Sequence, residues 1–281
     1  MKKQLEHLAR RIVPSTSLLS HNPLFKAVVN FSDLLPRAIW PEFRNLPPNH
    51  LRIRIGVGNR FFSNQTFYLG FAESFWLYYM GAGAIALDST IVDIGCGCGR
   101  FAHHLRDFNY QDTHFTGKYI GVDIDPEMLA WCRDHFDAPR FDFLHSTHSS
   151  KSYNQSGGST VYTIPVASQT VDFVFSQSLF THLLEPELRN YMEESFRILK
   201  PGAHMVMSIF CLDYPPPTFG GRHTFSHKIG NASVESLAVH EAAVAYTEAF
   251  VVGLARQVGF CQASVVGRDP SGWQRDLVAI K

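Results

Sequence analysis

From residue 88 to the end of the sequence, short apolar runs alternate with stretches of helical periodicity. Such runs are typical of strands buried inside a sheet, and strands separated by helices form parallel sheets. The expected strands are Ile91–Ile94, Tyr119–Ile124, Phe141–His145, Val171–Phe175, His204–Cys211, Ala263–Val266 and Asp276–Ile280. The expected helices are Arg100–Phe108, Pro126–Phe136, Glu185–Leu199 and Thr247–Val258. The chain is therefore predicted to be an α/β protein with a doubly wound, mostly parallel, seven-stranded sheet flanked by helices.

Residues 1–85 differ from this core, since they are rich in proline and aromatic residues and show no such alternation. We expect an irregular N-terminal extension, or cap, that packs on a core domain formed by residues 86–281. Its aromatic side chains are expected mainly to pack against that domain, with the wall of a substrate pocket as the alternative. A second addition, at about residues 212–240, is long for a connection and includes Gly220 and Gly221. This insertion after the fifth strand is predicted to be a lid.

The 281 residues include 25 basic and 25 acidic side chains, and 45% of them are apolar. This composition argues against disorder and against a nucleic-acid partner. The five cysteines are scattered, and no apolar run is long enough for a signal peptide near the start or for a membrane span. We therefore expect a cytoplasmic protein with reduced thiols and no membrane span, whose oligomeric state stays open. Basic residues near the start (Lys2, Lys3, Arg10 and Arg11) are interpreted as part of a surface helix, with peripheral membrane contact as the less favoured alternative.

A glycine-rich turn follows the first expected strand, with Gly95, Gly97 and Gly99 at alternate positions before the next helix. Glycine is needed where a tight turn lets the backbone approach a ligand, because a side chain would fill the ligand's place. The spacing differs from the Gly-x-Gly-x-x-Gly pattern of dinucleotide binders, whose third glycine would fall on Arg100. Asp93, just before the turn, would repel a phosphate and attract a cationic amine. The turn is therefore predicted to bind an amine-bearing ligand.

A carboxylate stands at the end of the second expected strand, where Asp123 is able to accept two hydrogen bonds from the hydroxyls of a ribose. Asp125 is the nearby rival, but Pro126 suits the first position of a helix, so Asp125 is predicted to be the N-cap. Cys96 and Cys98 make a poor metal site, since both lie in a turn whose backbone is already committed to the ligand. No metal is expected.

Three segments carry a resemblance to a known family: residues 92–100 (VDIGCGCGR), 121–129 (GVDIDPEML) and 197–203 (RILKPGA). They resemble the first, second and post-core motifs of the class I, Rossmann-like, S-adenosylmethionine-dependent methyltransferases. The resemblance covers about residues 85–281, and the first motif is the most specific. It implies that S-adenosyl-L-methionine is the cofactor and that S-adenosyl-L-homocysteine is the product.

The resemblance also implies roles for individual residues. Gly95, Gly97 and Gly99 would line the methionine part of the cofactor with Asp93 nearby, and Asp123 would hold the ribose. In each case the residue matches the family's motif at the corresponding position.

Four further residues complete the predicted cofactor site. Cys96 lies in the glycine turn and Ile124 follows the ribose carboxylate. Many family members bind the adenine amino group with an acidic residue after the third strand, but here the sequence reads His145-Ser146-Thr147. Thr147 or backbone groups are therefore expected to contact adenine. Ser176, after the fourth strand, is expected beside the sulfonium.

The sequence says less about the residues that contact the methyl acceptor, because methyl transfer from a sulfonium needs a general base only when the acceptor must lose a proton. His182 follows the fourth strand and is the first candidate base, with a packing or capping role as the alternative. His223 and His227, in the insertion, are further candidates. We predict a methyltransferase for a small-molecule acceptor, at a hydroxyl of a sugar or secondary metabolite. The alternatives are an RNA or protein methyltransferase and, less favoured, a nicotinamide-dependent oxidoreductase.

Overall fold

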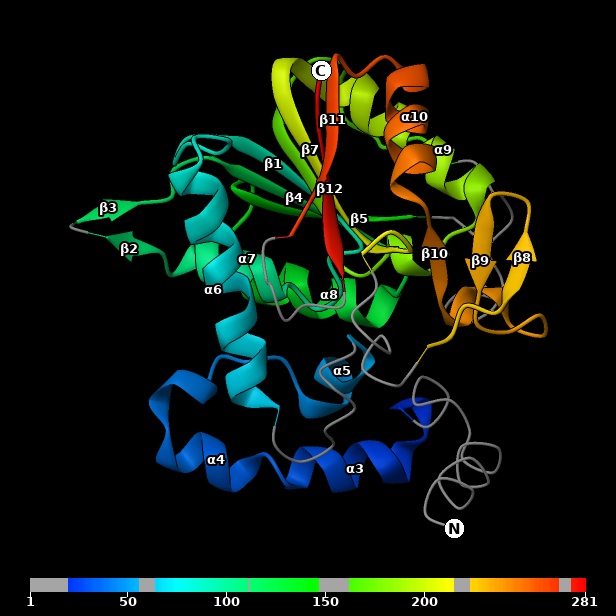
Figure 1. Cartoon of the computed structure of the whole chain (residues 1–281). Coiled ribbons are helices and arrows are strands. Elements are labelled where there is room, and N and C mark those ends of the chain that lie inside the picture. Colours follow the sequence, from blue (N-terminus) through cyan, green and yellow to red (C-terminus); the bar gives the residue numbers. More distant parts are fainter. Residues whose placement is uncertain (1–19, 56–63, 111, 147–161, 215–222, 268–273) are drawn as a thin grey trace.

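The computed structural model describes residues 20–55, 64–110, 112–146, 162–214, 223–267 and 274–281. Its central sheet has the strand order β5, β4, β1, β6, β7, and continues beyond β7 with β12 and then β11 (Figure 1). These strands are β1 (Thr90–Ile94), β4 (Lys118–Asp123), β5 (Phe141–His145), β6 (Val171–Ser176), β7 (Leu199–Cys211), β11 (Gln262–Val266) and β12 (Arg275–Ile280). All pairs from β5 to β7 are parallel, whereas β12 is antiparallel to both β7 and β11. The predicted α/β fold with a mostly parallel sheet is confirmed.

Helices cover both faces of this sheet (Figure 1). Helices α7 (Arg100–Arg106) and α8 (Pro126–His135) lie on one face, and α9 (Glu185–Ile198) and α10 (Glu248–Val258) on the other. Side chains alternate along a strand, so neighbouring residues of β1 such as Ile91 and Val92 belong to the apolar clusters of opposite faces. Because both faces are buried, a ligand site is expected at the carboxyl ends of the strands.

The boundary of one core strand was predicted wrongly. The expected helix Glu185–Leu199 and the expected strand His204–Cys211 left residues 200–203 as a connection, but α9 ends at Ile198 and β7 begins at Leu199. Gly202 has a φ of +79°, and the register between β6 and β7 shifts at Val171. The glycine therefore lets the strand pass through an irregular step that a sequence pattern interprets as a turn.

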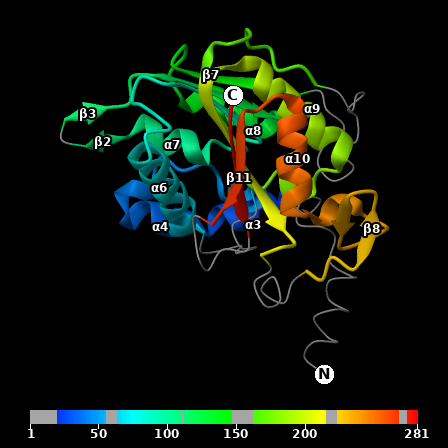
Figure 2. The same cartoon turned by 45° about the horizontal axis from the view of Figure 1, so that its top comes forward.

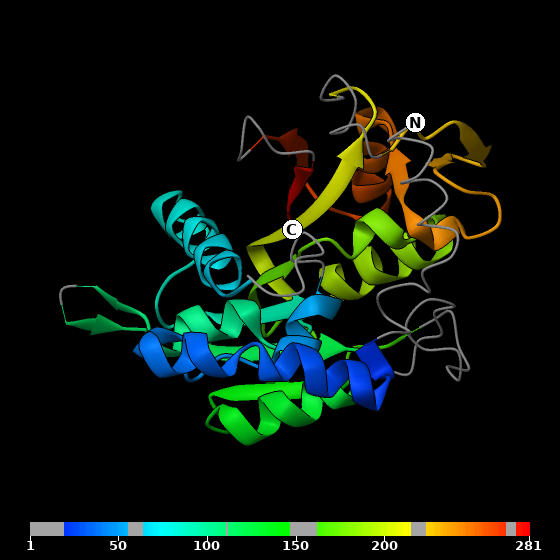
Figure 3. The same ribbon diagram turned by 90° about the horizontal axis from the view of Figure 1, so that it is seen from below.

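The N-terminal region is helical where it is described, contrary to the irregular structure that we expected. It contains α3 (Pro23–Phe31), α4 (Leu34–Ile39), the short 3-10 helix η1 (Pro41–Phe43), α5 (Asn49–Arg54) and α6 (Gln65–Gly81). Helices α3 and α4 form one border of the molecule, with α5 and α6 between them and the sheet (Figures 1 and 3). From here on, the word cap refers only to residues 20–55 of this extension.

Helix α6 belongs to the layer that covers the sheet. Phe75 packs against Phe175 with ring centroids 4.8 Å apart, and Trp76 Nε1 donates a hydrogen bond of 3.1 Å to the carbonyl oxygen of Phe101. Tyr79 donates from its hydroxyl to Asp276 of β12 at 2.7 Å. The buried residues of α6 recur at helical spacing, with Tyr68, Phe75 and Tyr79 among them. Leu77 and Tyr78 are exposed, so apolar residues outside the buried side hide the helical period in the sequence.

The insertion after β7 adds strands beside the core. Strands β8 (His227–Ile229) and β9 (Ala232–Val234) form a hairpin, and β10 (Val244–Tyr246) pairs with β9 and, in parallel, with the end of β7. This small sheet lies at the side of the molecule next to α10 (Figure 2). Another short hairpin joins β2 (Asn109–Tyr110) and β3 (Thr113–His114). Within the described ranges, no helix is both long and apolar enough to cross a membrane.

Candidate functional site

The glycine turn connects β1 to α7 at the carboxyl end of the sheet. Gly95, Gly97 and Gly99 have φ angles of +83°, +56° and +75°. Residues with a side chain rarely adopt this left-handed region, so the backbone path itself requires glycine. The amides of Gly95 and Cys96 donate to the carbonyl oxygen of Val122 at 2.7 and 3.1 Å, which holds the turn against the end of β4.

Protein side chains lie where these glycines lack a Cβ atom. A Cβ on Gly97 would stand 2.6 Å from Cγ2 of Ile55, in the cap, and one on Gly99 would stand 3.0 Å from Cε2 of Phe136. A Cβ on Gly95 would meet Leu179, after β6, at 3.3 Å. The turn is thus also a meeting point of the cap, the end of α8 and the loop after β6. This close packing is a second reason for glycine besides the approach of a ligand.

Asp123 joins the glycine turn to the turn after β4. Its Oδ2 accepts a hydrogen bond of 2.7 Å from the amide of Gly97, and its Oδ1 accepts one of 2.9 Å from the amide of Asp125. Burial raises the pKa of Asp123, although these backbone hydrogen bonds oppose the shift. The glycine turn and the end of β4, which the sequence motifs predicted to form the site, therefore meet, and the carboxylate of Asp123 lies between them.

Asp125 is the N-cap residue of α8, as predicted, and it also forms an ion pair with Arg54 of residues 20–55. Its Oδ1 accepts hydrogen bonds from the amides of Glu127 and Met128 at 2.9 and 3.2 Å. The buried guanidinium of Arg54 forms ion pairs of 2.8 Å with Asp125 and 2.6 Å with Glu127. Burial alone would raise the pKa of Glu127, but hydrogen bonds from Lys26, Arg54 and His50 hold it at about 2. The cap is therefore bound through charge to the first turn of the helix that follows Asp123.

Asp93 is buried before the glycine turn, with 1% of its surface exposed. The hydroxyl of Tyr119, on β4, donates a hydrogen bond to its Oδ2. Burial raises the pKa of Asp93 to about 7, although the hydrogen bond from Tyr119 lowers it. The structure thus places Asp93 within the packed face of the sheet, where it fixes β1 to β4 directly below the turn.

The thiols of the turn are packed inside the protein. Cys96 and Cys98 are both buried, and burial raises the pKa of Cys98 to about 12. The hydroxyl of Tyr68, on α6, donates to the carbonyl oxygen of Cys98 at 3.0 Å. Among the described residues, no group of three metal-binding side chains is found.

The carboxyl end of β6, which pairs with β1, carries the hydroxyl of Ser176. Ser176 is fully buried, and within the described part of the chain its Oγ has no hydrogen-bond partner. Ser178 has a φ of +63°; its amide donates to Ser208 at 2.6 Å and its hydroxyl donates to Gln274 at 3.1 Å. A buried hydroxyl without a partner is costly, so its presence here indicates a place for a polar group of a ligand.

The three candidate histidines lie on different elements. His182 ends a 3-10 helix (Phe180–His182), and its Nδ1 is 2.7 Å from the carbonyl oxygen of Glu241. Burial lowers the pKa of His182, although contact with that carbonyl opposes the shift. The ring of His223 lies 5.3 Å from that of Phe210, while His227 is exposed at the start of β8. Only His182 directly follows a strand that borders the glycine turn.

Several residues that the cap brings to the site were not predicted from the sequence. Ile55 and Arg54 contact the glycine turn and α8 from a segment about 40 residues or more before them, and Tyr68 reaches the turn from α6. No local pattern marks these contacts, because they depend on how the cap docks. Thr147, the predicted adenine contact, lies outside the described residues.

The sequence has recognisable relatives. The profile of a methyltransferase domain family matches residues 92–207. An arsenite methyltransferase of Aquipseudomonas alcaligenes is 29% identical over 136 residues, which cover 46% of this chain and 36% of that protein. A malonyl acyl-carrier-protein O-methyltransferase of Hahella chejuensis is 25% identical over 118 residues, which cover 42% of this chain and 35% of that protein. The chain thus spans about a third of the length of these relatives.

The fold also has a counterpart among solved structures. The crystal structure of an S-adenosylmethionine-dependent methyltransferase from Methanosarcina mazei has a TM-score of 0.50 and 20% identity, and the match covers 73% of this chain and 98% of that one. At this identity the likeness concerns the fold. The profile match contains the glycine turn, Asp123 and the end of β6. Residues 92–207 therefore match a methyltransferase domain family, in agreement with the motifs of S-adenosylmethionine-dependent methyltransferases that the sequence resembles.

Proposed function

We propose that the protein transfers the methyl group of S-adenosyl-L-methionine to a small-molecule acceptor. The observation that carries this proposal is the hydrogen bond from the Gly97 amide to Asp123, which joins the two cofactor motifs at the carboxyl ends of β1 and β4. Ligands of open α/β sheets bind at this edge. The family supports a methyltransferase, and the distribution of polar groups supports this place for its cofactor.

The residues present fit such a cofactor. The ribose hydroxyls would donate to Asp123 and the methionine part would lie along Gly95 and Gly97, next to Cys96 and Ile124. The buried hydroxyl of Ser176, which has no partner among the described residues, supports a polar ligand group near the end of β6. Thr147 stays our proposal for the adenine end. The bound cofactor supplies an electrophilic methyl group, and the protein's part is to orient the two reactants.

We propose a hydroxyl as the methyl acceptor and His182 as its general base. Contact of Nδ1 with the carbonyl oxygen of Glu241 favours a proton on that nitrogen, which leaves Nε2 of the neutral ring able to accept one. His223 and His227 would take part only if the insertion closes as a lid. The two relatives are named for arsenite and for malonyl acyl-carrier protein, and neither name includes RNA. An RNA or protein methyltransferase stays the alternative.

S-adenosylhomocysteine is expected to raise the melting temperature of the purified protein, because a ligand that binds only the native state stabilises it by mass action. NAD at the same concentration serves as the control and is expected to have no effect, since the glycine spacing does not suit a pyrophosphate. The absence of a shift with millimolar S-adenosylhomocysteine, in folded protein free of copurified cofactor, would refute the proposed cofactor.

Asp123→Ala is expected to weaken binding of S-adenosylhomocysteine by about 1.5–3 kcal/mol, the usual scale for lost hydrogen bonds to a charged group. Asp125→Ala should mainly lower the free energy of unfolding, by more than the roughly 1 kcal/mol of a lost N-cap, because Arg54 also loses a partner. Isothermal titration and chemical unfolding separate the two effects. A larger loss of affinity at Asp125 than at Asp123 would reverse the assignment of the ribose ligand.

His182→Asn is expected to lower kcat by roughly 10²-fold without changing the affinity for S-adenosylhomocysteine, because asparagine can donate to Glu241 but cannot take up a proton. In the wild type, kcat should fall as pH drops below the ordinary histidine value of 6.5, since the pKa of His182 is lowered. In the variant, kcat should not fall in this way at acidic pH. The rate of product formation with hydroxyl acceptors measures kcat and its pH dependence. His114→Ala, at an exposed histidine, is the control. An unchanged kcat in His182→Asn would assign His182 to packing.

A further inference from the structure

Arg100 is a buried arginine that directly follows the glycine turn. Only 8% of its surface is exposed, and within the described part of the chain its Nε has no hydrogen-bond partner. The ion pairs found among the described residues involve other arginines. A guanidinium carries a permanent charge and five N–H donors, so its burial without a partner is costly. Such a group indicates a place for a ligand that supplies the missing acceptors.

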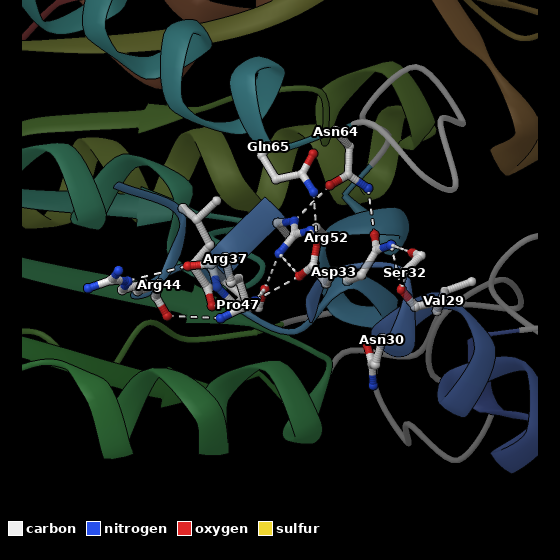
Figure 4. A network of polar contacts seen from close by, with 12 residues as sticks. Val29, Asn30, Ser32, Asp33, Arg37, Arg44, Pro47, Arg52, Asn64 and Gln65 are labelled. Carbon is white, nitrogen blue, oxygen red and sulfur yellow. Dashed lines mark hydrogen bonds and ion pairs between the residues drawn. The ribbon is translucent and has the colours of Figure 1, made fainter. Parts of the chain in front are cut away.

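The other two buried arginines of the described chain both have acidic partners. Arg52 is fully buried and donates to both carboxylate oxygens of Asp33, at 2.6 and 2.9 Å (Figure 4). Arg54 is as little exposed as Arg100 and forms two ion pairs with the first turn of α8. This fold therefore provides carboxylates for the arginines that it buries for structural reasons, and Arg100 is the exception.

Asp93 acts on Arg100 through its charge but forms no ion pair with it in the described structure. Its carboxylate accepts a hydrogen bond from the hydroxyl of Tyr119 on the neighbouring strand. Burial lowers the pKa of Arg100, and the charge of Asp93 opposes this shift. Since burial raises the pKa of Asp93 itself to about 7, this carboxyl group compensates the charge of the guanidinium only in part.

Two aromatic rings hold the guanidinium of Arg100. Its central carbon lies 4.3 Å from the ring centroid of Phe71, on α6, and 5.4 Å from that of Phe101. The attraction between a cation and the face of a ring fixes the side chain but uses none of its N–H donors. The edge of the guanidinium plane, with its N–H groups, stays available for a planar carboxylate.

The same rings place Arg100 on the β6 side of the glycine turn. The ring centroid of Phe101 lies 5.0 Å from that of Phe175, the residue of β6 that precedes Ser176. In the sheet, β1 separates β6 from β4, whose end carries Asp123. Arg100 therefore lies towards the strand beside which we expect the sulfonium and the methyl acceptor, and not towards the proposed ribose ligand.

We propose that Arg100 binds a carboxylate of the methyl acceptor, so that the substrate is a hydroxy acid rather than a neutral alcohol or sugar. The N–H groups of the guanidinium donate to the carboxylate, while the ring of Phe71 covers one face of the cation. Arg100 acts in binding and specificity, and removal of the hydroxyl proton stays with His182. The inference rests on the proposed function and names the class of its acceptor.

Ligand binding to the full chain saturated with S-adenosylhomocysteine tests this proposal. The probes are two hydroxy acids, lactate and salicylate, each compared with its neutral amide. In the parent, the acids are expected to raise the melting temperature more than the amides do. Arg100→Met keeps an unbranched apolar side chain and should weaken binding of the acids about tenfold or more, to the level of the amides.

Two controls separate this effect from a structural one. Arg106→Met, on the same helix, should keep the preference for the acids, since the Arg106 guanidinium also lies over a ring but is paired with Asp107. Without any ligand, Arg100→Met should leave the melting temperature unchanged or raise it, because it removes a buried charge that has no ion pair in the described structure. A purely structural arginine would instead stabilise the fold, so its loss would lower the melting temperature.

Three results would overturn the proposal. Equal binding of acids and amides to the parent would show that the guanidinium takes no carboxylate. A preference for the acids that persists in Arg100→Met would assign the carboxylate to another residue. A tenfold loss of affinity for S-adenosylhomocysteine in Arg100→Met would assign Arg100 to the carboxylate of the cofactor. Failure of the proposed function is distinct, because the parent would then not bind S-adenosylhomocysteine, whereas the preference for the acids is also measured without it.

Discussion

Gly97→Ala is expected to lose most of the affinity for S-adenosylhomocysteine, at least about tenfold, while the far-UV circular dichroism stays near that of the parent. The φ of +56° at Gly97 disfavours a side chain, and the new Cβ would stand 2.6 Å from Ile55. The amide of Gly97 also donates to Asp123, so a shift of the turn would move the proposed ribose ligand. Isothermal titration measures the affinity, and binding as tight as that of the parent would contradict a cofactor site at this turn.

Two further variants separate the causes of that loss. Gly97→Ala/Ile55→Ala removes the contact with the cap and keeps the backbone strain. Recovery of affinity in this double variant would show that displacement of the cap, rather than occupation of cofactor space, weakens binding. Cys98→Ala is the control within the turn, because it changes a buried side chain that packs with Phe43 and Tyr68 and leaves the glycines intact. It should bind S-adenosylhomocysteine almost normally.

Arg52→Ala is expected to lower the free energy of unfolding by about 3–5 kcal/mol, the scale for removing one partner of a buried ion pair. Asp33 is 2% exposed and, among the described residues, would keep Arg37 and Gln65 as its partners. Chemical denaturation at neutral pH measures the loss. Arg44→Ala, an exposed arginine of the same cap, is the control and should change stability by no more than about 0.5 kcal/mol.

The destabilisation by Arg52→Ala should depend on pH. Burial raises the pKa of Asp33, but Arg52 and Arg37 outweigh burial and lower the pKa below its ordinary value of 3.8. A carboxyl group with a lowered pKa stabilises the folded state above its unfolded pKa, and this contribution disappears as pH falls through the folded value. The difference between parent and variant should therefore be largest near neutral pH and shrink in acid below 3.8. A difference that grows in acid would mean that the ion pair is not its source.

Local patterns were sufficient for the core elements and for part of the site. The alternation of strands and helices follows from the need to bury both faces of a parallel sheet, and it is visible in the sequence from residue 88 onward. The N-cap role of Asp125 was predictable because Pro126 follows it, and both hydrogen bonds to the first-turn amides are present. The proximity of the glycine turn to Asp123 follows from the topology, since the carboxyl ends of parallel strands share one edge.

The sequence by itself thus determined the seven core strands, the helices between them and the two motifs that meet at one edge of the sheet, but not the strands β8 to β10 that extend it. Only the tertiary structure decided what surrounds them: Ile55 against Gly97, Arg54 against Asp125, and Tyr119 below Asp93. It also decided that the aromatic stretch before residue 85 is a helix, because packing of Phe75, Trp76 and Tyr79 against the sheet selects one side of a segment that is apolar on several sides. Local patterns record how one segment prefers to fold, whereas contacts between distant segments depend on shape and charge that no single segment contains.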